Sequence, residues 1–147
     1  MLKPYVCVAC EKIILAKDNV ASLINLFSKI IVAVPTNSPD IPRNAVAPKE
    51  WAIFSSWDTE LGDELKDYEF CTQIFYPDGT PFGEPGKVRI PIDPGKRAQV
   101  TVQIPAFPIG QTGLYTVKTW IEEGQTKVFG PIGFGIELAV VQQDRAQ

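Results

Sequence analysis

Residues 98–122 read AQVTVQIPAFPIGQTGLYTVKTWIE, and both halves of this stretch alternate between apolar and polar side chains. In the first half, Val100, Val102 and Ile104 occupy every second position. A period of two residues is typical of a β-strand that packs one face on a core. The second half has the same period, with one face formed by Tyr115, Val117, Thr119 and Ile121 and the other by Lys118, Trp120 and Glu122. The stretch therefore predicts two neighbouring strands.

The same pattern recurs near the C-terminal end, where one face would carry Phe134, Ile136, Leu138 and Val140. Turn signals separate the strands. Tyr76-Pro77-Asp78-Gly79 and Asp93-Pro94-Gly95 supply glycine for a positive φ, and Glu123-Gly124-Gln125 closes a third predicted hairpin. A spacing of about ten residues between turn signals favours a sandwich or barrel of strands. We therefore expect an all-β fold.

The first half of the sequence is less regular. Residues 5–16 predict one long strand, or two strands with a bulge. Residues 20–34 fit a helical period, yet the β-branched tract Ile30-Ile31-Val32 favours a strand. We interpret this run as extended, with a break near Ser28-Lys29. The proline-rich residues 36–49 and the acidic residues 58–66 are predicted to be loops.

Gln111-Thr112-Gly113-Leu114-Tyr115-Thr116-Val117 resembles the tyrosine corner of immunoglobulin-like domains. In that motif the tyrosine hydroxyl bonds back to the preceding turn. Val117 stands where such domains often carry a disulfide cysteine, so the bridge of antibody domains is not expected.

The whole chain also resembles an uncharacterised family of small bacterial proteins. The resemblance rests on Ala9-Cys10-Glu11, on Lys17-Asp18-Asn19 and on the run from Leu23 to Val32, followed by the proline-rich stretch, the 76–79 hairpin and the tyrosine corner. It implies an immunoglobulin-like antiparallel β-sandwich, which we expect to have about seven to nine strands. The length of 147 residues fits a single domain over residues 1–147. It implies no activity, substrate or catalytic residue.

Composition excludes several classes of function. The net charge is −3 and the basic residues are dispersed, so we expect no binding to nucleic acid. No stretch approaches about 18 uninterrupted apolar residues, so we expect no membrane-spanning helix. The first residues do not form a signal peptide, and three cysteines are an odd number. Both observations predict a cytoplasmic protein.

The sequence contains no histidine, which removes Ser-His and Cys-His nucleophile pairs and the commonest metal ligand. No phosphate-binding or nucleophile motif is present either. Cys7-Val8-Ala9-Cys10 lies in a strand pattern, where residues three apart face opposite sides, so we interpret both as buried structural thiols. We therefore predict that the chain is not an enzyme and needs no cofactor.

The residues Glu60, Asp63, Glu64, Asp67 and Glu69 form an acidic cluster. Its spacing is not that of a calcium-binding loop, so we interpret it as a solvated face and predict no metal. Asp63, Glu64 and Asp67 are the candidate ligands if a metal does bind.

Three tryptophans are the candidate contact residues. Trp120 alternates with Lys118 on the face opposite the predicted core, where an exposed indole could anchor a protein or stack on a sugar. The alternative is that another segment covers it. Trp51 and Trp57 are the further candidates.

These observations predict a non-catalytic, cytoplasmic protein-interaction module that binds a protein partner or itself, with Trp120, Lys118, Trp51 and Trp57 as possible contacts. An outer sheet face, an edge strand or the loop 36–49 would provide the surface. The alternative is a β-sandwich module that binds a carbohydrate or another small ligand.

Overall fold

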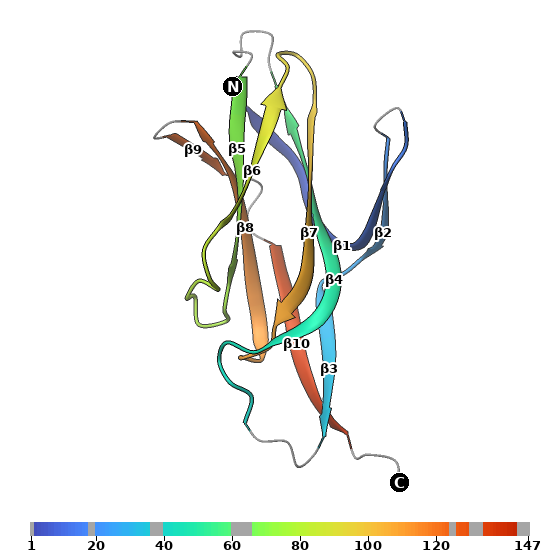
Figure 1. Ribbon diagram of the computed structural model, residues 1–147, viewed down its shortest axis with the longest axis vertical. Coiled ribbons are helices and arrows are strands. Elements are labelled where there is room, and N and C mark those ends of the chain that lie inside the picture. The colour runs from blue at the N-terminus through green and yellow to red at the C-terminus, as the bar shows by residue number, and fades with distance from the viewer. Residues whose placement is uncertain are drawn as a thin grey trace.

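A computed structural model describes residues 2–17, 20–35, 40–59, 66–123, 126–129 and 134–143. Every regular element in these ranges is a strand, and the strands form two packed sheets (Figure 1). The first sheet has the order β2-β1-β4-β7, with β1 (Lys3–Leu15), β2 (Ala21–Leu26), β4 (Val46–Asp58) and β7 (Ala98–Pro108). The chain is therefore an all-β, sandwich-like protein.

The second sheet has the order β3-β10-β8-β5-β6, and β9 pairs with β8 off this path. Its strands are β3 (Lys29–Pro35), β5 (Lys66–Phe75), β6 (Gly86–Ile92), β8 (Gly113–Glu123), β9 (Thr126–Phe129) and β10 (Phe134–Gln143). The described ranges thus hold ten strands, one more than the upper end of the expectation. They contain no helix with the length and hydropathy needed to cross a membrane.

The pairing of β3 with β10 is parallel, whereas the other strand pairs are antiparallel. The chain leaves β2 in the first sheet, crosses at Phe27 and Ser28, and enters β3 in the second sheet. The amide of Glu137 donates to the carbonyl of Ser28 over 2.8 Å and fixes the start of this pairing. The sheet is mixed because a crossover between sheets does not reverse the chain as a hairpin does.

The extended interpretation of the first half is confirmed. β1 is one continuous strand whose register shifts between Pro4 and Val6. Residues 20–34 form β2 and β3 with a break at Phe27-Ser28, one residue before the predicted position. Asp18 and Asn19, which precede residues 20–34 in the sequence, lie outside the described residues.

Two predictions about connections were wrong in part. β4 begins at Val46, so residues 46–49 belong to a strand and not to the predicted loop 36–49. The register of β4 shifts between Pro48 and Trp51, which lets the sheet accommodate a residue without an N–H. The turn at Asp93-Pro94-Gly95 forms, with φ of 78° at Gly95, but it joins β6 to β7 across the two sheets and is not a hairpin.

The core lies between the inner faces of the two sheets, as the alternation predicts. Tyr115, Val117 and Ile121 of β8 are fully buried. The larger of two buried clusters comprises Ala9, Ile30, Trp51, Ile53, Ile74, Tyr76, Phe107, Tyr115, Val117, Ile136 and Leu138. The smaller cluster comprises Leu2, Trp57, Tyr68, Phe70, Ile90, Val100 and Ile121.

The hydrogen bonds of the predicted tyrosine corner are present. The hydroxyl of Tyr115 donates to the carbonyl of Gln111 over 2.6 Å and accepts from the amide of Gln111 over 3.1 Å. One buried hydroxyl thus satisfies both backbone groups of a residue in the turn before β8.

We expect Tyr115→Phe to lower the free energy of unfolding by about 1–3 kcal/mol, because it leaves the N–H and C=O of Gln111 without their partner. Urea denaturation followed by far-ultraviolet circular dichroism measures this loss. Tyr5→Phe removes the same atom from an exposed ring and serves as the control, with an expected change within about 0.5 kcal/mol. Equal effects of the two substitutions would contradict the assigned role.

Candidate interaction surface

The predicted tryptophan contacts do not form an accessible site. The side chains of Trp51 and Trp57 are fully buried, and Trp120 retains 7% of its surface. Trp51 packs against Phe27 and Phe107, with ring centroids 5.9 and 5.7 Å apart. The prediction that Trp51 and Trp57 meet a partner is corrected by this burial, because a ring enclosed by the core offers no face to a sugar or a protein.

Trp120 lies on the outer face of its sheet, as predicted, and is covered rather than exposed. Its indole N–H donates to Oε1 of Glu122 over 3.0 Å, and its position is opposite Cys71 on β5. Lys118 is exposed on the same face, with its Nζ 5.0 Å from the ring centroid of Phe75. The structure thus brings Lys118 and Trp120 onto one face but separates them from Trp51 and Trp57.

All three cysteines are free thiols. Cys7 faces the second sheet, where its Sγ lies 3.6 Å from Oγ1 of Thr119, whereas the Sγ of Cys10 lies 3.9 Å from the carbonyl of Ala52 within the first sheet. Burial raises the pKa of both thiols. Burial, and then the charge of Glu122, raises the pKa of Cys71 to about 11. Each is therefore a poor nucleophile at neutral pH, because the thiolate is the reactive form.

Only part of the acidic cluster lies within the described residues. Glu60, Asp63 and Glu64 lie outside the described residues, as does the side chain of Asp67. The carboxylate of Glu69 lies 3.9 Å from Nζ of Lys87 on β6. In the described part of the chain, no group of three or more Cys, Asp or Glu residues is placed to hold a metal.

The most unusual surface is a hairpin arm that we define as residues 11–15 of β1 together with residues 20–26. Figure 1 shows this arm leaving the body of the sandwich beside β4, with β2 on its outer side. Large aliphatic side chains in the arm are between 38% and 63% exposed, namely Ile14, Leu15, Val20, Ile24 and Leu26. Such a concentration of exposed apolar side chains on one element is a mark of an interaction site.

The pairing of β1 with β2 explains why the arm has exposed apolar side chains. Ile13 lies opposite Leu23 on one face of the hairpin, whereas Ile14 lies opposite Ser22 on the other. Because side chains alternate between faces, consecutive aliphatic residues make both faces apolar. Among the described residues, the arm has no second layer on either side. Ile14, Leu15, Ile24 and Leu26 are therefore exposed, whereas Ile13 and Leu23 are partly buried.

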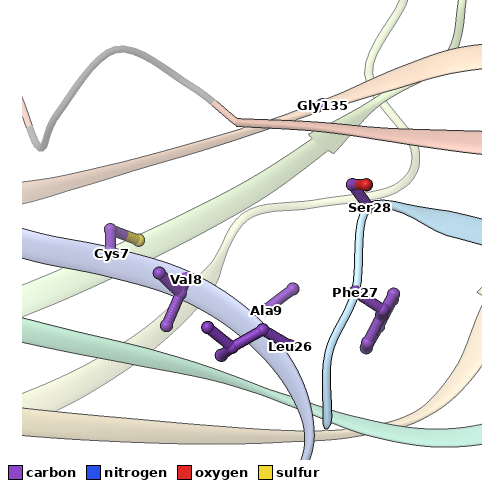
Figure 2. Close-up of a pocket in the computed structure, with 7 residues that line it drawn as sticks. All are labelled: Cys7, Val8, Ala9, Leu26, Phe27, Ser28 and Gly135. Atoms are coloured by element: carbon purple, nitrogen blue, oxygen red, sulfur yellow. The ribbon is translucent and has the colours of Figure 1, made fainter.

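A pocket of about 250 Å³ lies at the base of the arm. Its lining is mainly apolar and consists of Cys7, Val8, Ala9, Leu26, Phe27, Ser28 and Gly135. Figure 2 shows Cys7, Val8 and Ala9 along β1, with Phe27 and Ser28 on the link that crosses between the sheets. Leu26 belongs to both the arm and the pocket, so the two form one continuous apolar surface.

Sequence reasoning missed the arm, although the signal was present. The runs Ile13-Ile14-Leu15 and Leu23-Ile24 lack alternation, which is typical of strands covered on both faces. A sequence does not distinguish a strand covered within its own chain from one that awaits a partner, because both carry the same residues.

The fold and the arm define a β-sandwich with a projecting apolar hairpin. The sequence matches no protein-family model and no curated protein.

Proposed function

We propose that this chain is a non-catalytic, cytoplasmic protein-interaction module and that the arm is its contact surface. The observation that carries the proposal is the set of exposed aliphatic side chains on both faces of the arm, continuous with the apolar pocket at its base. Burial of aliphatic surface by a partner contributes about 25 cal/mol of free energy for each Å² removed from water. We expect the partner to be a protein and not a nucleic acid, because a net charge of −3 does not attract nucleic acid.

Two further sets of observations support the non-catalytic role and the cytoplasmic location. The raised pKa values of the thiols and the absence of histidine from the sequence favour a binding role over catalysis. Three free cysteines suit the reducing conditions of the cytoplasm.

We also propose that the sandwich is immunoglobulin-like, in line with the resemblance to small bacterial proteins. The tyrosine corner before β8 supports this assignment. The packing of two sheets around one core supports it as well.

Binding of a small apolar ligand is the second candidate function. The pocket at the base of the arm favours it, because its volume approaches that of known ligand sites and its walls are apolar. The carbohydrate form of this alternative has no support from the tryptophans, since all three indoles are buried.

The proposal predicts that Ile14→Ser combined with Leu15→Ser lowers the affinity for a native partner at least about tenfold, because the change removes apolar surface from both faces of the arm. The immobilised wild-type chain captures partners from a lysate of the source organism. Each purified partner is then titrated against both chains by calorimetry.

The matched control combines Val88→Ser with Leu114→Ser, two exposed aliphatic residues outside the arm. We expect this control to bind as the wild type does. Equal binding by the arm variant would place the contact elsewhere, and the absence of any titratable partner would overturn the proposal.

A further inference from the structure

The described edge strands differ in how they are protected against pairing with another chain. An open edge presents unpaired backbone N–H and C=O groups, and charged residues or prolines block unwanted partners. β3 begins with Lys29, and β6 carries Lys87 and Arg89. β7 has no charge but contains Pro105 and Pro108.

β2 lacks these protective features. Its sequence Ala-Ser-Leu-Ile-Asn-Leu contains no charged residue and no proline, although it forms the outer edge of its sheet. Its side chains at Ile24 and Leu26 are exposed, and so is Val20 just before it. Asn25 has a positive φ of 55°, so the regularly extended backbone that is open to pairing comprises residues 21–24.

We propose that β2 pairs antiparallel with β2 of a second copy of this chain, so that the two four-stranded sheets become one continuous sheet across a two-fold axis. This inference rests on the proposed function and specifies its partner. A two-fold interface uses the same surface of each copy, so it closes after two chains and does not extend into a fibre.

Charge favours a second copy as the occupant. In a symmetric antiparallel pair centred on Leu23, Ser22 of each copy lies opposite Ile24 of the other. The positive φ of 55° at Asn25 ends the regular ladder after this pair. No charged side chain enters this ladder, whereas self-pairing of β6 would bring Lys87 and Arg89 of two copies together. Like charges directly opposite one another destabilise a sheet.

The shape of the molecule also favours this arrangement. The arm projects away from the sandwich, so two copies can join at their arms while their bodies lie on opposite sides (Figure 1). Antiparallel pairing places the tip of each arm, with Leu15 and Val20, beside the base of the other. That base carries Leu26 and the apolar pocket. The exposed Val20 of each copy then comes near the exposed Leu26 of the other, while the two faces of the paired arms stay open to solvent.

Light scattering on the eluate of a size-exclusion column, run with the purified full chain over a series of concentrations, tests this inference. We expect the mass to rise with concentration towards 32.4 kDa, twice the 16.2 kDa of one chain. Ser22→Lys places two like charges in the ladder, opposite Ile14 within its own chain, and should raise the dissociation constant at least about tenfold. Hydrogen exchange of the wild type should show greater protection of the amides of residues 21–26 at high concentration.

Val88→Lys on β6 is the matched control, because it adds the same charge at an exposed aliphatic residue outside the arm, and it should dimerise as the wild type does. If Ser22→Lys does not fold by circular dichroism, Ile24→Lys at an exposed position of the same strand replaces it. A wild-type mass of 16.2 kDa at every concentration overturns the inference, as does a dimer that the lysine in β2 leaves unchanged. A monomer that still captures a partner through Ile14 and Leu15 would refute self-pairing alone and leave the proposed function in place.

Discussion

Trp51→Ala is expected to destabilise the protein by about 3–5 kcal/mol, a large share of the stability of a chain of this size. Trp51 is fully buried in the larger core cluster and contacts Phe27 and Phe107. Its removal leaves a cavity that the surrounding β-strands cannot collapse to fill. Phe27 lies in the link between β2 and β3, so the loss also loosens the crossover between the two sheets.

The indole of Trp51 has a second role, because its N–H donates to the carbonyl of Ala106 over 3.0 Å. Ala106 lies opposite Pro48 in the register of β4 and β7, and proline has no N–H to offer to the sheet. The tryptophan thus supplies a donor beside the irregularity that the proline introduces.

Thermal and urea denaturation of Trp51→Ala and Trp51→Phe measure these contributions. Phenylalanine keeps most of the apolar volume but cannot donate to Ala106, so we expect it to recover more than half of the loss. Leu114→Ala, at a side chain 58% exposed, is the control and should change stability by no more than about 0.5 kcal/mol. If Leu114→Ala lost as much stability as Trp51→Ala, burial of the tryptophan would not explain its effect on stability.

The sequence allowed good predictions where one face of a strand meets the core and the other meets solvent. Residues 114–118 of β8 show this pattern, and the burial of Tyr115 and Val117 follows directly from the alternation, whereas Trp120 on the outer face is buried as well. The tyrosine corner was also predictable, because its hydrogen bonds are local and span only four residues.

Prediction failed where a strand is covered on both faces or on neither. Residues 51–57 of β4 are all buried, including Ser55 and Ser56, so the pattern shows no alternation. Trp57 and Trp51 therefore appeared available for contacts although they belong to the core. In the arm, consecutive aliphatic residues such as Ile14 and Leu15 are typical of a buried strand, yet both side chains are exposed.

The parallel pairing of β3 with β10 was unpredictable for a different reason. It joins Lys29 to Glu137 and Ile30 to Leu138 across more than a hundred residues. No local pattern specifies such a partner. The choice depends on the crossover at Phe27-Ser28, which sends the chain from one sheet to the other.

Three connections meet at one end of the sandwich, and their contacts centre on Arg43 and Asp78. The guanidinium of Arg43 lies 2.9 Å from the carboxylate of Asp78, which also accepts from the side-chain amide of Gln111 over 2.9 Å. Hydrogen bonds from Thr80, then from Gln111, lower the pKa of Asp78. The hydroxyl of Tyr76 donates to the backbone carbonyl of Arg43 over 2.8 Å. These contacts join the segment before β4, the β5–β6 connection and the turn before β8.

Gly110 permits this convergence, because its backbone passes directly against that of Arg43. A Cβ at residue 110 would lie 1.9 Å from the carbonyl oxygen of Arg43 and 2.5 Å from its carbonyl carbon. These atoms belong to the main chain, so no side-chain rotation relieves the overlap. Gly110→Ala must therefore displace the segment at Arg43, and with it the carbonyl that accepts from Tyr76.

We expect Gly110→Ala to lower the free energy of unfolding by about 3 kcal/mol, from the overlap and the lost hydrogen bond together. Urea denaturation measures the loss, and the fluorescence of the buried tryptophans reports the transition. Gly86→Ala makes the same chemical change in β6, where the nearest heavy atom to the new Cβ is the carbonyl oxygen of Thr72 at 3.9 Å. That variant should remain within about 0.5 kcal/mol of the wild type. Because the two substitutions add the same methyl group, a difference between their free energies of unfolding measures the effect of the close backbone approach at Arg43. Equal free energies would show that the segment at Arg43 moves without loss of stability.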